Sequence, residues 1–343
     1  MKLTKILPLA LLTVGLTSCL DDEPITGRTE DAQNIIEFLE TPTAPATEGY
    51  ILPVYNRIFD VVPSTTFEVT VNYAGTSVAP EDIEVGIVVD EAALDAYNEK
   101  IIADERAHLI EIGEDPEDAE AHVAGELFDL IPAELYEVPS SVTIKKGERQ
   151  ATFEVTVRPE LFDFAYKYGL PLTLTADEKY NVSGNFGSGI FQLGAKNKYH
   201  ANYSVTATSP MVDKVNAALV GYYPLDSDLI TTGARSVVMY SWTYLGGYEG
   251  HPIKNGTAGS YYGSFAPVFH MDEAGNVIDV TNYYGQPAGN GRAAKLNPEG
   301  VNKWTFDAEG NPESLEVSYI MVQAGADRTF FHEKWTFEGE AKK

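Results

Sequence analysis

The sequence of 343 residues contains a single cysteine, Cys19. One thiol cannot form a disulfide within the chain, so packing has to stabilise the fold, and a chain of this length can supply it. Basic residues are also scarce: 24 lysines and arginines stand against 51 aspartates and glutamates, a formal net charge of −27. That balance argues against a nucleic-acid partner and against electrostatic docking on an anionic membrane.

Motifs of catalysis and cofactor binding are missing from the sequence. It has no G-x-S-x-G, no H-E-x-x-H, no phosphate-binding loop and no dinucleotide fingerprint, and its six histidines are scattered. No acidic stretch has the D-x-D-x-D-G spacing of a calcium loop. Among 51 acids, a carboxylate pair suited to glycoside hydrolysis would arise by chance. We therefore predict no catalytic residue, no metal and no cofactor.

The apolar run near the start of the chain is too short to cross a bilayer as a helix. It covers residues 6–16 and follows two lysines, which is the arrangement of a secretory signal. Its end, Leu16-Thr17-Ser18-Cys19, resembles the lipobox of bacterial lipoproteins, in which cleavage precedes the cysteine and the thiol carries a diacylglycerol. We predict a signal peptide over residues 1–18 and lipidation at Cys19. The alternative is an ordinary signal peptide that happens to contain a cysteine.

Acidic residues follow the cysteine almost at once, at Asp21, Asp22 and Glu23. Acid in this place resembles the surface-export signal of Bacteroidetes lipoproteins, although a tether can also be polar for no such reason. Residues 19–48 are predicted to be an acidic, flexible tether, because prolines and glycines interrupt them and strong periodicity is lacking. A short ordered element at residues 34–40 is compatible with this assignment.

Residues 49–195 repeatedly alternate apolar and polar side chains, as half-buried strands do. The clearest case is residues 66–73, which place Phe67, Val69, Val71 and Tyr73 on one face. Further strands are predicted over residues 83–89, 170–175 and 189–193, and a hairpin joins residues 141–144 to 151–157 through a glycine turn. The spacing favours an antiparallel β-sandwich.

One segment of this domain, residues 91–130, has helical spacing instead, with Leu94, Tyr97 and Ile101 on one side. Pro116 divides it into two helical pieces. His108 and His122 lie among its acids on separate pieces, which favours solvated helix faces over a metal site.

Three strings in this domain resemble a known family: "LDAYN" (94–98), "FDLIPAELYEVPSSVTIKKGERQATFEVTV" (128–157) and "YGLPLTLTA" (168–176). They are similar to the N-terminal domain of Bacteroidetes lipoproteins encoded in polysaccharide-utilisation loci. The resemblance covers roughly residues 50–195 and implies an immunoglobulin-like β-sandwich. Residues 99–127 depart from the family pattern as an insertion.

Residues 196–343 contain two similar strings, "FHMDEAGNVIDVTNYY" (269–284) and "WTFDAEGNPESLEVSYI" (304–320). Each runs from an aromatic strand through an acidic Gly-Asn turn into a return strand, so both are predicted hairpins. With "RTFFHEKWTFEG" (328–339) as a last strand, this part resembles the lipocalin-like antiparallel barrel or curled sheet that often accompanies the family. The predicted fold class is all-β, with a helical insertion in the first domain.

Aromatic residues of the second domain fall into two groups. Those with strand alternation are assigned to packing: Tyr240, Trp242 and Tyr244; Trp304 and Phe306; Phe331, Trp335 and Phe337. Others lie in two glycine-rich loops, residues 244–265 and 282–292. A sugar ring presents an apolar face to an aromatic ring and a rim of hydroxyls to amide or guanidinium groups. The candidate glycan-binding residues are therefore Tyr248, His251, Tyr262, Tyr283, Tyr284, Gln286 and Arg292.

Anchor, family resemblance and loop aromatics together favour one function. We expect a lipid-anchored protein of the outer membrane, facing the cell exterior, which binds or presents glycan for a polysaccharide uptake system. The expected partners are a polysaccharide or oligosaccharide and a TonB-dependent transporter complex. Two alternatives remain open: a structural or adhesive surface lipoprotein without a small ligand, and a glycoside hydrolase or its accessory.

Overall fold

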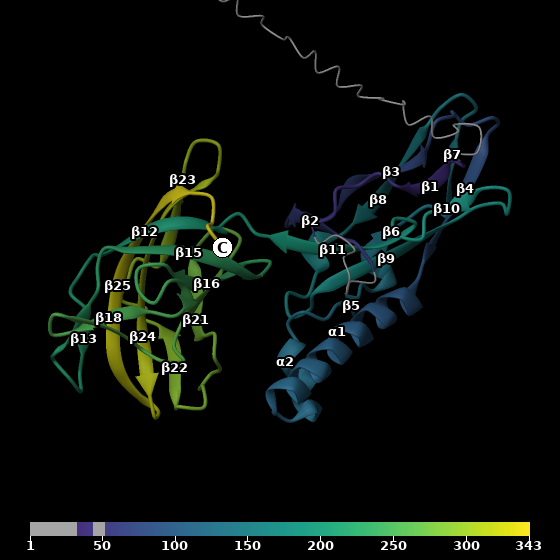
Figure 1. The fold of residues 1–343 in the computed structure, drawn as a ribbon. Coiled ribbons are helices and arrows are strands. Elements are labelled where there is room, and N and C mark those ends of the chain that lie inside the picture. The colour runs from purple at the N-terminus through teal and green to yellow at the C-terminus, as the bar shows by residue number, and fades with distance from the viewer. Residues whose placement is uncertain (1–32, 44–51) are drawn as a thin grey trace, which may run out of the picture.

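The computed structural model describes residues 33–43 and 52–343. The predicted signal peptide and Cys19 lie outside these residues. The described chain forms two β-rich units with separate hydrophobic cores, one built from residues 36–193 and the other from residues 199–335 (Figure 1). The predicted all-β, two-domain fold is thus confirmed. No helix in the described ranges is both long enough and apolar enough to span a membrane.

The first unit is a sandwich of two sheets whose facing side chains make the core. Phe67, Val69, Val71 and Tyr73 are buried in it, as their alternation predicts. One sheet has the order β10 (Asn181–Val182), β1 (Ile35–Phe38), β3 (Thr65–Ala74), β8 (Gln150–Val157) and β6 (Tyr136–Glu137). The other has the order β2 (Val54–Asp60), β11 (Ser188–Lys196), β9 (Tyr168–Thr175), β4 (Ile83–Val89) and β7 (Ser141–Ile144), with β5 (Asp129–Leu130) beside β9.

Strand β1 comes from the segment that the sequence assigns to the tether. It pairs with β3, and its Ile36 and Phe38 are buried in the core. The buried Asn34 side chain precedes it and donates to the carbonyl oxygens of Tyr73 (3.3 Å) and Ser77 (2.6 Å). The ordered element within residues 34–40 is therefore a strand of the sandwich, and these residues do not belong to the tether.

The predicted hairpin of residues 141–157 is wrong. Strand β7 pairs with β4 and β8 pairs with β3, so the two segments belong to opposite sheets. The turn between them contains Gly147, whose φ of 87° suits glycine, and it crosses from one layer of the sandwich to the other. Both segments alternate, because each buries one face in the same core.

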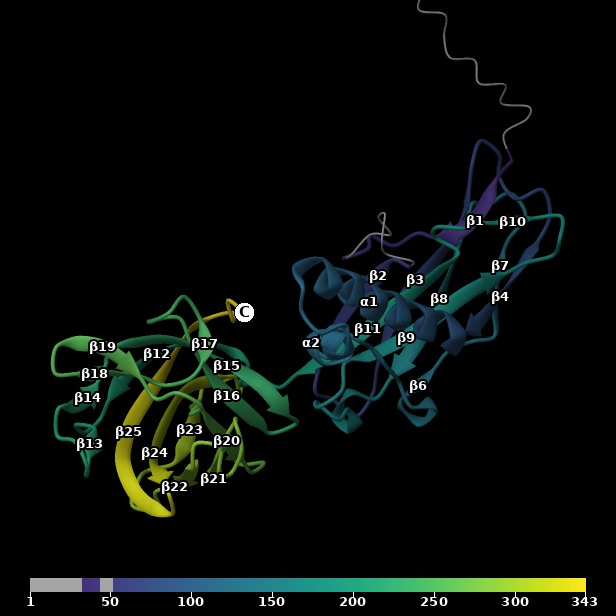
Figure 2. The same cartoon turned by 60° about the horizontal axis from the view of Figure 1, so that its bottom comes forward.

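The predicted helical insertion forms α1 (Glu91–Ile112), a 3₁₀ turn (Pro116–Asp118) and α2 (Ala119–Val123). Helix α1 lies over the outer face of the second sheet (Figure 2). There Leu94 and Tyr97 pack in a cluster that includes Val54 of β2 and Ile190 of β11. Two further 3₁₀ turns cover Ala133–Leu135 and Pro159–Leu161.

Asn98 fastens the insertion to the sandwich. Its Nδ2 donates to the carbonyl oxygen of Phe128 at 2.8 Å, and its Oδ1 accepts from the Phe128 amide at 3.0 Å. The segment between the two residues can therefore extend outward without disturbing the sheet beneath it. This explains the "LDAYN" string: Leu94 and Tyr97 pack, and Asn98 ties the end of the insertion to its start.

The second unit is built on one antiparallel sheet that curls into a nearly closed barrel (Figure 1). Its order is β21 (Val277–Asn282), β20 (Pro267–Met271), β16 (Ser236–Ser241), β15 (Leu225–Gly233), β12 (Ala201–Ala207), β25 (Ala326–Gly339), β24 (Pro312–Gln323) and β22 (Arg292–Leu296). Strands β13 (Val212–Asp213), β17 (Tyr248–Glu249) and β23 (Lys303–Phe306) pair with β25, β16 and β24. A small sheet holds β14 (Leu219–Gly221), β18 (Pro252–Asn255) and β19 (Ala258–Tyr261).

Side-chain amides close this barrel at the seam between its end strands, β21 and β22. The Oε1 atom of Gln286 accepts from the backbone amides of Asn282 and Ala294, each at 3.0 Å, and its Nε2 donates to the Ala294 carbonyl. The buried Asn282 adds a bond from its Nδ2 to the carbonyl oxygen of Arg292 at 3.1 Å. A side chain thus replaces the backbone ladder between the two edges.

The two similar strings form the predicted hairpins, β20–β21 and β23–β24. In each turn an aspartate, Asp272 or Asp307, accepts from the backbone and side-chain nitrogens of the asparagine four residues later. The first turn also lies against the first strand of the second hairpin, because the Trp304 amide in β23 donates to the Gly275 carbonyl oxygen at 2.9 Å. The two strings are therefore similar in structure as well as in sequence.

The connection between the units is short and hydrogen-bonded. Strand β11 ends at Lys196 and β12 begins at Ala201. The buried Asn197 donates through its Nδ2 to the carbonyl oxygens of Gly233 and Ser236, both at 2.9 Å. On the other side, the Val61 amide donates to the Lys196 carbonyl at 3.1 Å.

A Gln286→Ala variant tests the seam. It removes three hydrogen bonds between β21 and β22, so we expect the free energy of unfolding to fall by about 1–3 kcal/mol. Urea denaturation measures the change. Gln150→Ala, an exposed position on β8, is the control and should shift it by less than about 0.5 kcal/mol. Equal stability of the two variants would show that the amide does not close the barrel.

Candidate functional site

The two glycine-rich loops predicted to carry a site meet on the surface of the second unit. The Tyr284 hydroxyl donates to the Glu249 carbonyl oxygen at 2.7 Å, and the Asn290 side chain donates to the Gly263 carbonyl oxygen at 2.8 Å. These bonds join residues 282–292 to residues 244–265. The structure thus brings together two segments that the sequence only shows to be similar in composition.

Tyrosine rings gather where these loops meet. We call this set the tyrosine surface; it consists of Tyr222, Tyr244, Tyr248, Tyr261, Tyr283 and Tyr284. Ring centroids are 6.2 Å apart for Tyr222 and Tyr244, 6.3 Å for Tyr244 and Tyr261, and 5.7 Å for Tyr248 and Tyr261. Tyr261, Tyr283 and Tyr284 keep 47%, 49% and 43% of their surface exposed, although most large side chains of this unit are buried.

Glycine makes room for these rings. A Cβ atom on Gly259 would lie 2.9 Å from Cε2 of Tyr244, and one on Gly250 would lie 2.2 Å from Cε2 of Tyr248. Both distances are too short for any side chain, so the rings lie directly against the backbone. The glycine content of the loop is therefore required by the packing of the tyrosines.

Polar groups accompany the rings. The Lys254 ammonium lies 4.8 Å from the centroid of Tyr222. The hydroxyl of Tyr248 is buried and has no hydrogen-bond partner among the described residues. Burial raises the pKa of this hydroxyl, so it stays protonated and can both donate and accept. The surface can therefore offer aromatic faces together with a cation and hydroxyl groups.

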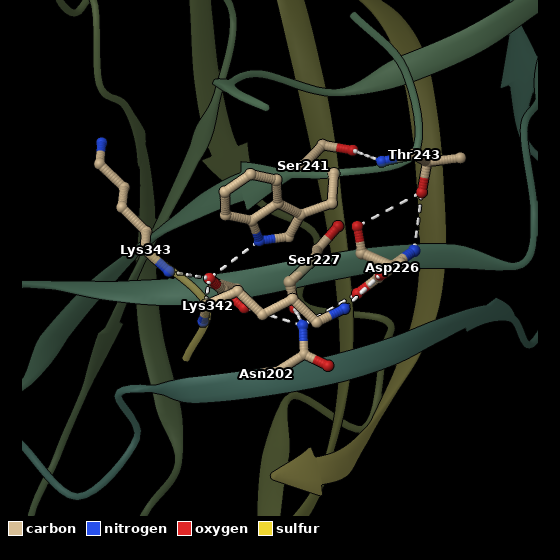
Figure 3. A network of polar contacts seen from close by, with 9 residues as sticks. Asn202, Asp226, Ser227, Ser241, Thr243, Lys342 and Lys343 are labelled. Carbon is tan, nitrogen blue, oxygen red and sulfur yellow. Dashed lines mark hydrogen bonds and ion pairs between the residues drawn. The ribbon is translucent and has the colours of Figure 1, made fainter. Parts of the chain in front are cut away.

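An acidic cradle formed by Asp226, Asp228 and Glu249 adjoins the tyrosine surface, because the Tyr284 hydroxyl donates to the Glu249 carbonyl oxygen. Figure 3 shows Asp226 of this cradle with Lys342 and Lys343. Asp228 is fully buried, and its Oδ2 accepts from the backbone amides of Lys342 (2.8 Å) and Lys343 (2.9 Å) and from the Trp242 indole (2.9 Å). Burial is thus matched by three N–H donors on one oxygen atom.

The two lysines complete the cradle with their ammonium groups. Lys342 pairs with Asp226 at 2.5 Å, and Lys343 pairs with Glu249 and lies 4.2 Å from the ring centroid of Tyr240. A cleft of about 450 Å³ opens beside them, between Trp242, Asp226 and neighbouring residues. Since the chain's own lysines pair with two of the three carboxylates and the third, Asp228, is buried, the tyrosines offer the freer surface for a ligand.

Two predicted ligand residues, His251 and Tyr262, are buried and cannot contact a ligand at the surface. The Nε2 atom of His251 lies 2.6 Å from Oε1 of the buried Glu333. The Tyr262 hydroxyl donates to Asp213 at 2.7 Å. Both residues belong to buried polar networks, because His251 contacts the Glu333 carboxylate on β25 and Tyr262 contacts the Asp213 carboxylate on β13.

Gln286 and Arg292, two other candidates, hold the loops in place. Gln286 uses its amide at the barrel seam. Arg292 donates through Nε to Gln323 Oε1 at 3.0 Å and through Nη1 to the Gly263 carbonyl oxygen. Tyr248, Tyr283 and Tyr284 are the candidates that the structure brings together on the tyrosine surface.

The assignment of aromatics to packing is confirmed for four of the eight residues, and the half-buried Tyr240 and Trp242 lie outside the barrel core. Trp304, Phe331 and Trp335 are buried in the core, with Phe306 packed against it. Phe337 is 48% exposed, so its assignment to packing is wrong. Tyr244 lies beyond the end of β16 and joins the tyrosine surface. Tyr222 could not be found from sequence, because only the pairing of β14 with β18 brings it beside Tyr244.

Glu333 forms a buried polar network with four other side chains. Its carboxylate also accepts from the Tyr223 hydroxyl (2.7 Å), the Tyr319 hydroxyl (3.0 Å) and the Trp335 indole (3.1 Å). Burial opposes ionisation of this carboxyl, but the nearby His251 and the hydroxyl donors outweigh it and lower its pKa. The network therefore fills the barrel interior with satisfied polar groups.

Asp213 gives a testable pH dependence. Burial alone would raise its pKa, but hydrogen bonds from Tyr262, two backbone amides and Thr329 bring it down from 3.8 to about 2. A depressed folded-state pKa stabilises the fold above the unfolded-state pKa, and this contribution is lost as pH falls from about 4 towards 2. The stability gap between the wild type and Asp213→Asn should therefore be constant above pH 5 and narrow below pH 4.

Thermal unfolding at pH 2–7 measures this gap. Asp95→Asn, an exposed position on α1, is the matched control and should give a small gap at every pH. A gap for Asp213→Asn that stays constant down to pH 2 would contradict the assignment.

A model for a family described as an N-terminal domain matches residues 45–181. This match agrees with the resemblance found from sequence for the first unit. Comparison with curated proteins returned no match.

The chain is similar to several solved structures, and one of them, with a TM-score above 0.5, shares its fold. A Bacteroides ovatus protein of unknown function is 11% identical, covers 90% of this chain and 95% of its own, and has a TM-score of 0.51. An auxiliary nutrient binding protein of Bacteroides thetaiotaomicron is 14% identical, with 83% and 90% covered and a TM-score of 0.43. A candidate carbohydrate binding protein of Bacteroides ovatus is 11% identical, with 88% and 79% covered and a TM-score of 0.34.

Proposed function

We propose that this chain is a lipid-anchored protein of the cell surface that binds glycan through the tyrosine surface, for an outer-membrane polysaccharide uptake system. The observation that carries the proposal is the meeting of two loops that leave Tyr261, Tyr283 and Tyr284 exposed. When the C–H face of a sugar covers an exposed aromatic ring, the apolar surface of the ring is removed from water, which favours binding. The tyrosine hydroxyls can also form hydrogen bonds with the hydroxyl groups of the sugar.

Several features of the tyrosine surface suit a chain of sugars better than one small molecule. The rings extend across the small sheet β14–β18–β19 and both loops. They are fixed by contacts with one another and with glycine backbone, so little conformational entropy is lost when a ligand binds. The Lys254 ammonium supplies a polar contact beside the rings.

The proposed location rests on the first residues of the chain. The lipobox-like sequence ending at Cys19 would attach the protein to a membrane, and Asp21, Asp22 and Glu23 would direct it to the cell exterior. Two acyl chains hold a protein stably on a bilayer, whereas one chain does so only marginally. The first unit would then lie between the anchor and the tyrosine surface, and the uptake complex would be the partner that receives the glycan.

A double variant, Tyr261→Ala with Tyr284→Ala, tests glycan binding. Removing two exposed rings should weaken binding at least tenfold, because each aromatic contact contributes about 0.5–1.5 kcal/mol beyond the area it buries. Affinity electrophoresis against a broad polysaccharide panel finds the ligand, and calorimetry then measures the change. Tyr166→Ala is the matched control, since Tyr166 is 53% exposed on the first unit. Unchanged affinity in the double variant, or no binding to any polysaccharide, would refute the function and favour a structural or adhesive role.

A Cys19→Ala variant tests the anchor. Without the thiol no lipid can be attached, so the protein should move from the detergent-extracted membrane fraction to the soluble fraction when cells are fractionated. Thr26→Ala, in the predicted tether, should leave the protein in the membrane fraction. A Cys19→Ala protein that remains membrane-bound would exclude lipidation as the anchor. Digestion of intact cells with protease tests in parallel whether the wild type faces outward.

A further inference from the structure

Two arginines converge on one tyrosine at the edge of the tyrosine surface. Residues 196–343 contain three arginines, and the guanidinium carbons of Arg292 and Arg328 lie 5.3 and 5.8 Å from the ring centroid of Tyr262. The two guanidinium groups carry the same charge and repel each other, because both lie within about 6 Å of the Tyr262 ring. Two neighbouring cations are also unusual in a chain that is strongly acidic as a whole. The placement therefore calls for a physical explanation.

Hydrogen bonds within the protein use only some of the N–H donors of the two guanidinium groups. Arg328 donates through Nε to the buried Asp213 at 3.0 Å. Arg292 donates through Nε to Gln323 and through Nη1 to the Gly263 carbonyl oxygen. Among the described residues, both terminal nitrogens of Arg328 and Nη2 of Arg292 have no hydrogen-bond acceptor.

One carboxylate balances the two cations, so the pair carries a net positive charge. Asp213 is ionised, and it pairs with Arg328. Burial and the proximity of Arg328 both lower the pKa of Arg292, because each disfavours its positive charge. An acceptor with two or more oxygen atoms would relieve this repulsion and satisfy the free N–H groups.

The pair adjoins the tyrosine surface directly. A Cβ atom on Gly263 would lie 3.8 Å from Nη1 of Arg292 and 3.9 Å from Cε2 of the exposed Tyr261. The arginine and the tyrosine therefore flank the same glycine. A sugar stacked on Tyr261 would have its substituents within reach of the arginine pair.

We propose that Arg292 and Arg328 form a subsite for an anionic group of the bound glycan, a carboxylate or a sulfate. The inference rests on the proposed glycan-binding function and makes it narrower: the ligand is an acidic polysaccharide. Planar guanidinium groups bind carboxylate and sulfate oxygens through paired N–H donors, which a neutral sugar cannot match. The acidic surface elsewhere would repel such a polymer weakly at physiological salt, because charges beyond about 8 Å are screened.

Calorimetry with four polysaccharides tests the subsite. Polygalacturonate and its carboxyl-reduced form separate carboxylate recognition from the sugar backbone, and a sulfated galactan and its desulfated form do the same for sulfate. The purified protein should bind at least one acidic polymer tenfold or more tightly than its neutral counterpart. Arg328→Gln should remove most of that preference, because a hydrogen bond to a charged group contributes about 1.5–3 kcal/mol.

Two further variants control for folding and for charge. Arg328→Lys keeps the cation beside Asp213 but loses the paired donors, so it should retain an intermediate preference. Arg235→Gln removes an arginine of the same unit that pairs with the exposed Glu273, and the preference should not change. Binding of neutral polymers should be the same in all variants, which shows that each is folded.

The outcomes separate this inference from the function on which it rests. If the protein binds neutral and acidic polymers equally, or if Arg328→Gln keeps the full preference, the subsite is refuted and glycan binding stands. If no polymer of the broad panel binds, both are refuted. A tenfold preference that Arg328→Gln abolishes and Arg235→Gln preserves supports the subsite, and the polymer pair that shows it identifies the anion.

Discussion

The second unit depends on a seam closed by side-chain amides. Its sheet begins with β21 and ends with β22, and Gln286 holds these edges together by bonding to the backbone of both. The same bonds fix the start of the loop that carries Tyr283 and Tyr284. The hydrogen bonds that close the barrel therefore also position the exposed rings. Residues 282–292 cannot move freely without breaking these bonds.

Sequence patterns predict the strands well because alternation reports a buried face. They do not report which sheet a strand joins, so the sequence predicts a hairpin of β7 and β8 although the two strands belong to opposite layers. The same limit applies to the candidate site. His251 and Tyr262 lie in glycine-rich loops, but their carboxylate partners are 82 and 49 residues away in the chain. Only the fold reveals that these side chains point inward.

The aromatic residues of the second unit serve two purposes that composition alone does not separate. Trp304, Trp335 and their neighbours fill the barrel, and buried carboxylates satisfy the polar tips of several rings. The tyrosines outside the barrel contact glycine backbone and one another. A filled interior therefore moves any recognition of ligand to the outside of the barrel, where the loops meet.

The connection between the units has a mechanical consequence. Lys196 and Asn197 are hydrogen-bonded to opposite units, and only residues 197–200 separate the last strand of one from the first strand of the other. A connection this short has almost no slack. Tension on a long polymer held by the second unit would pass through these residues to the sandwich, and from there to whatever holds the sandwich in place. The elastic part of such a system would have to lie elsewhere in the chain.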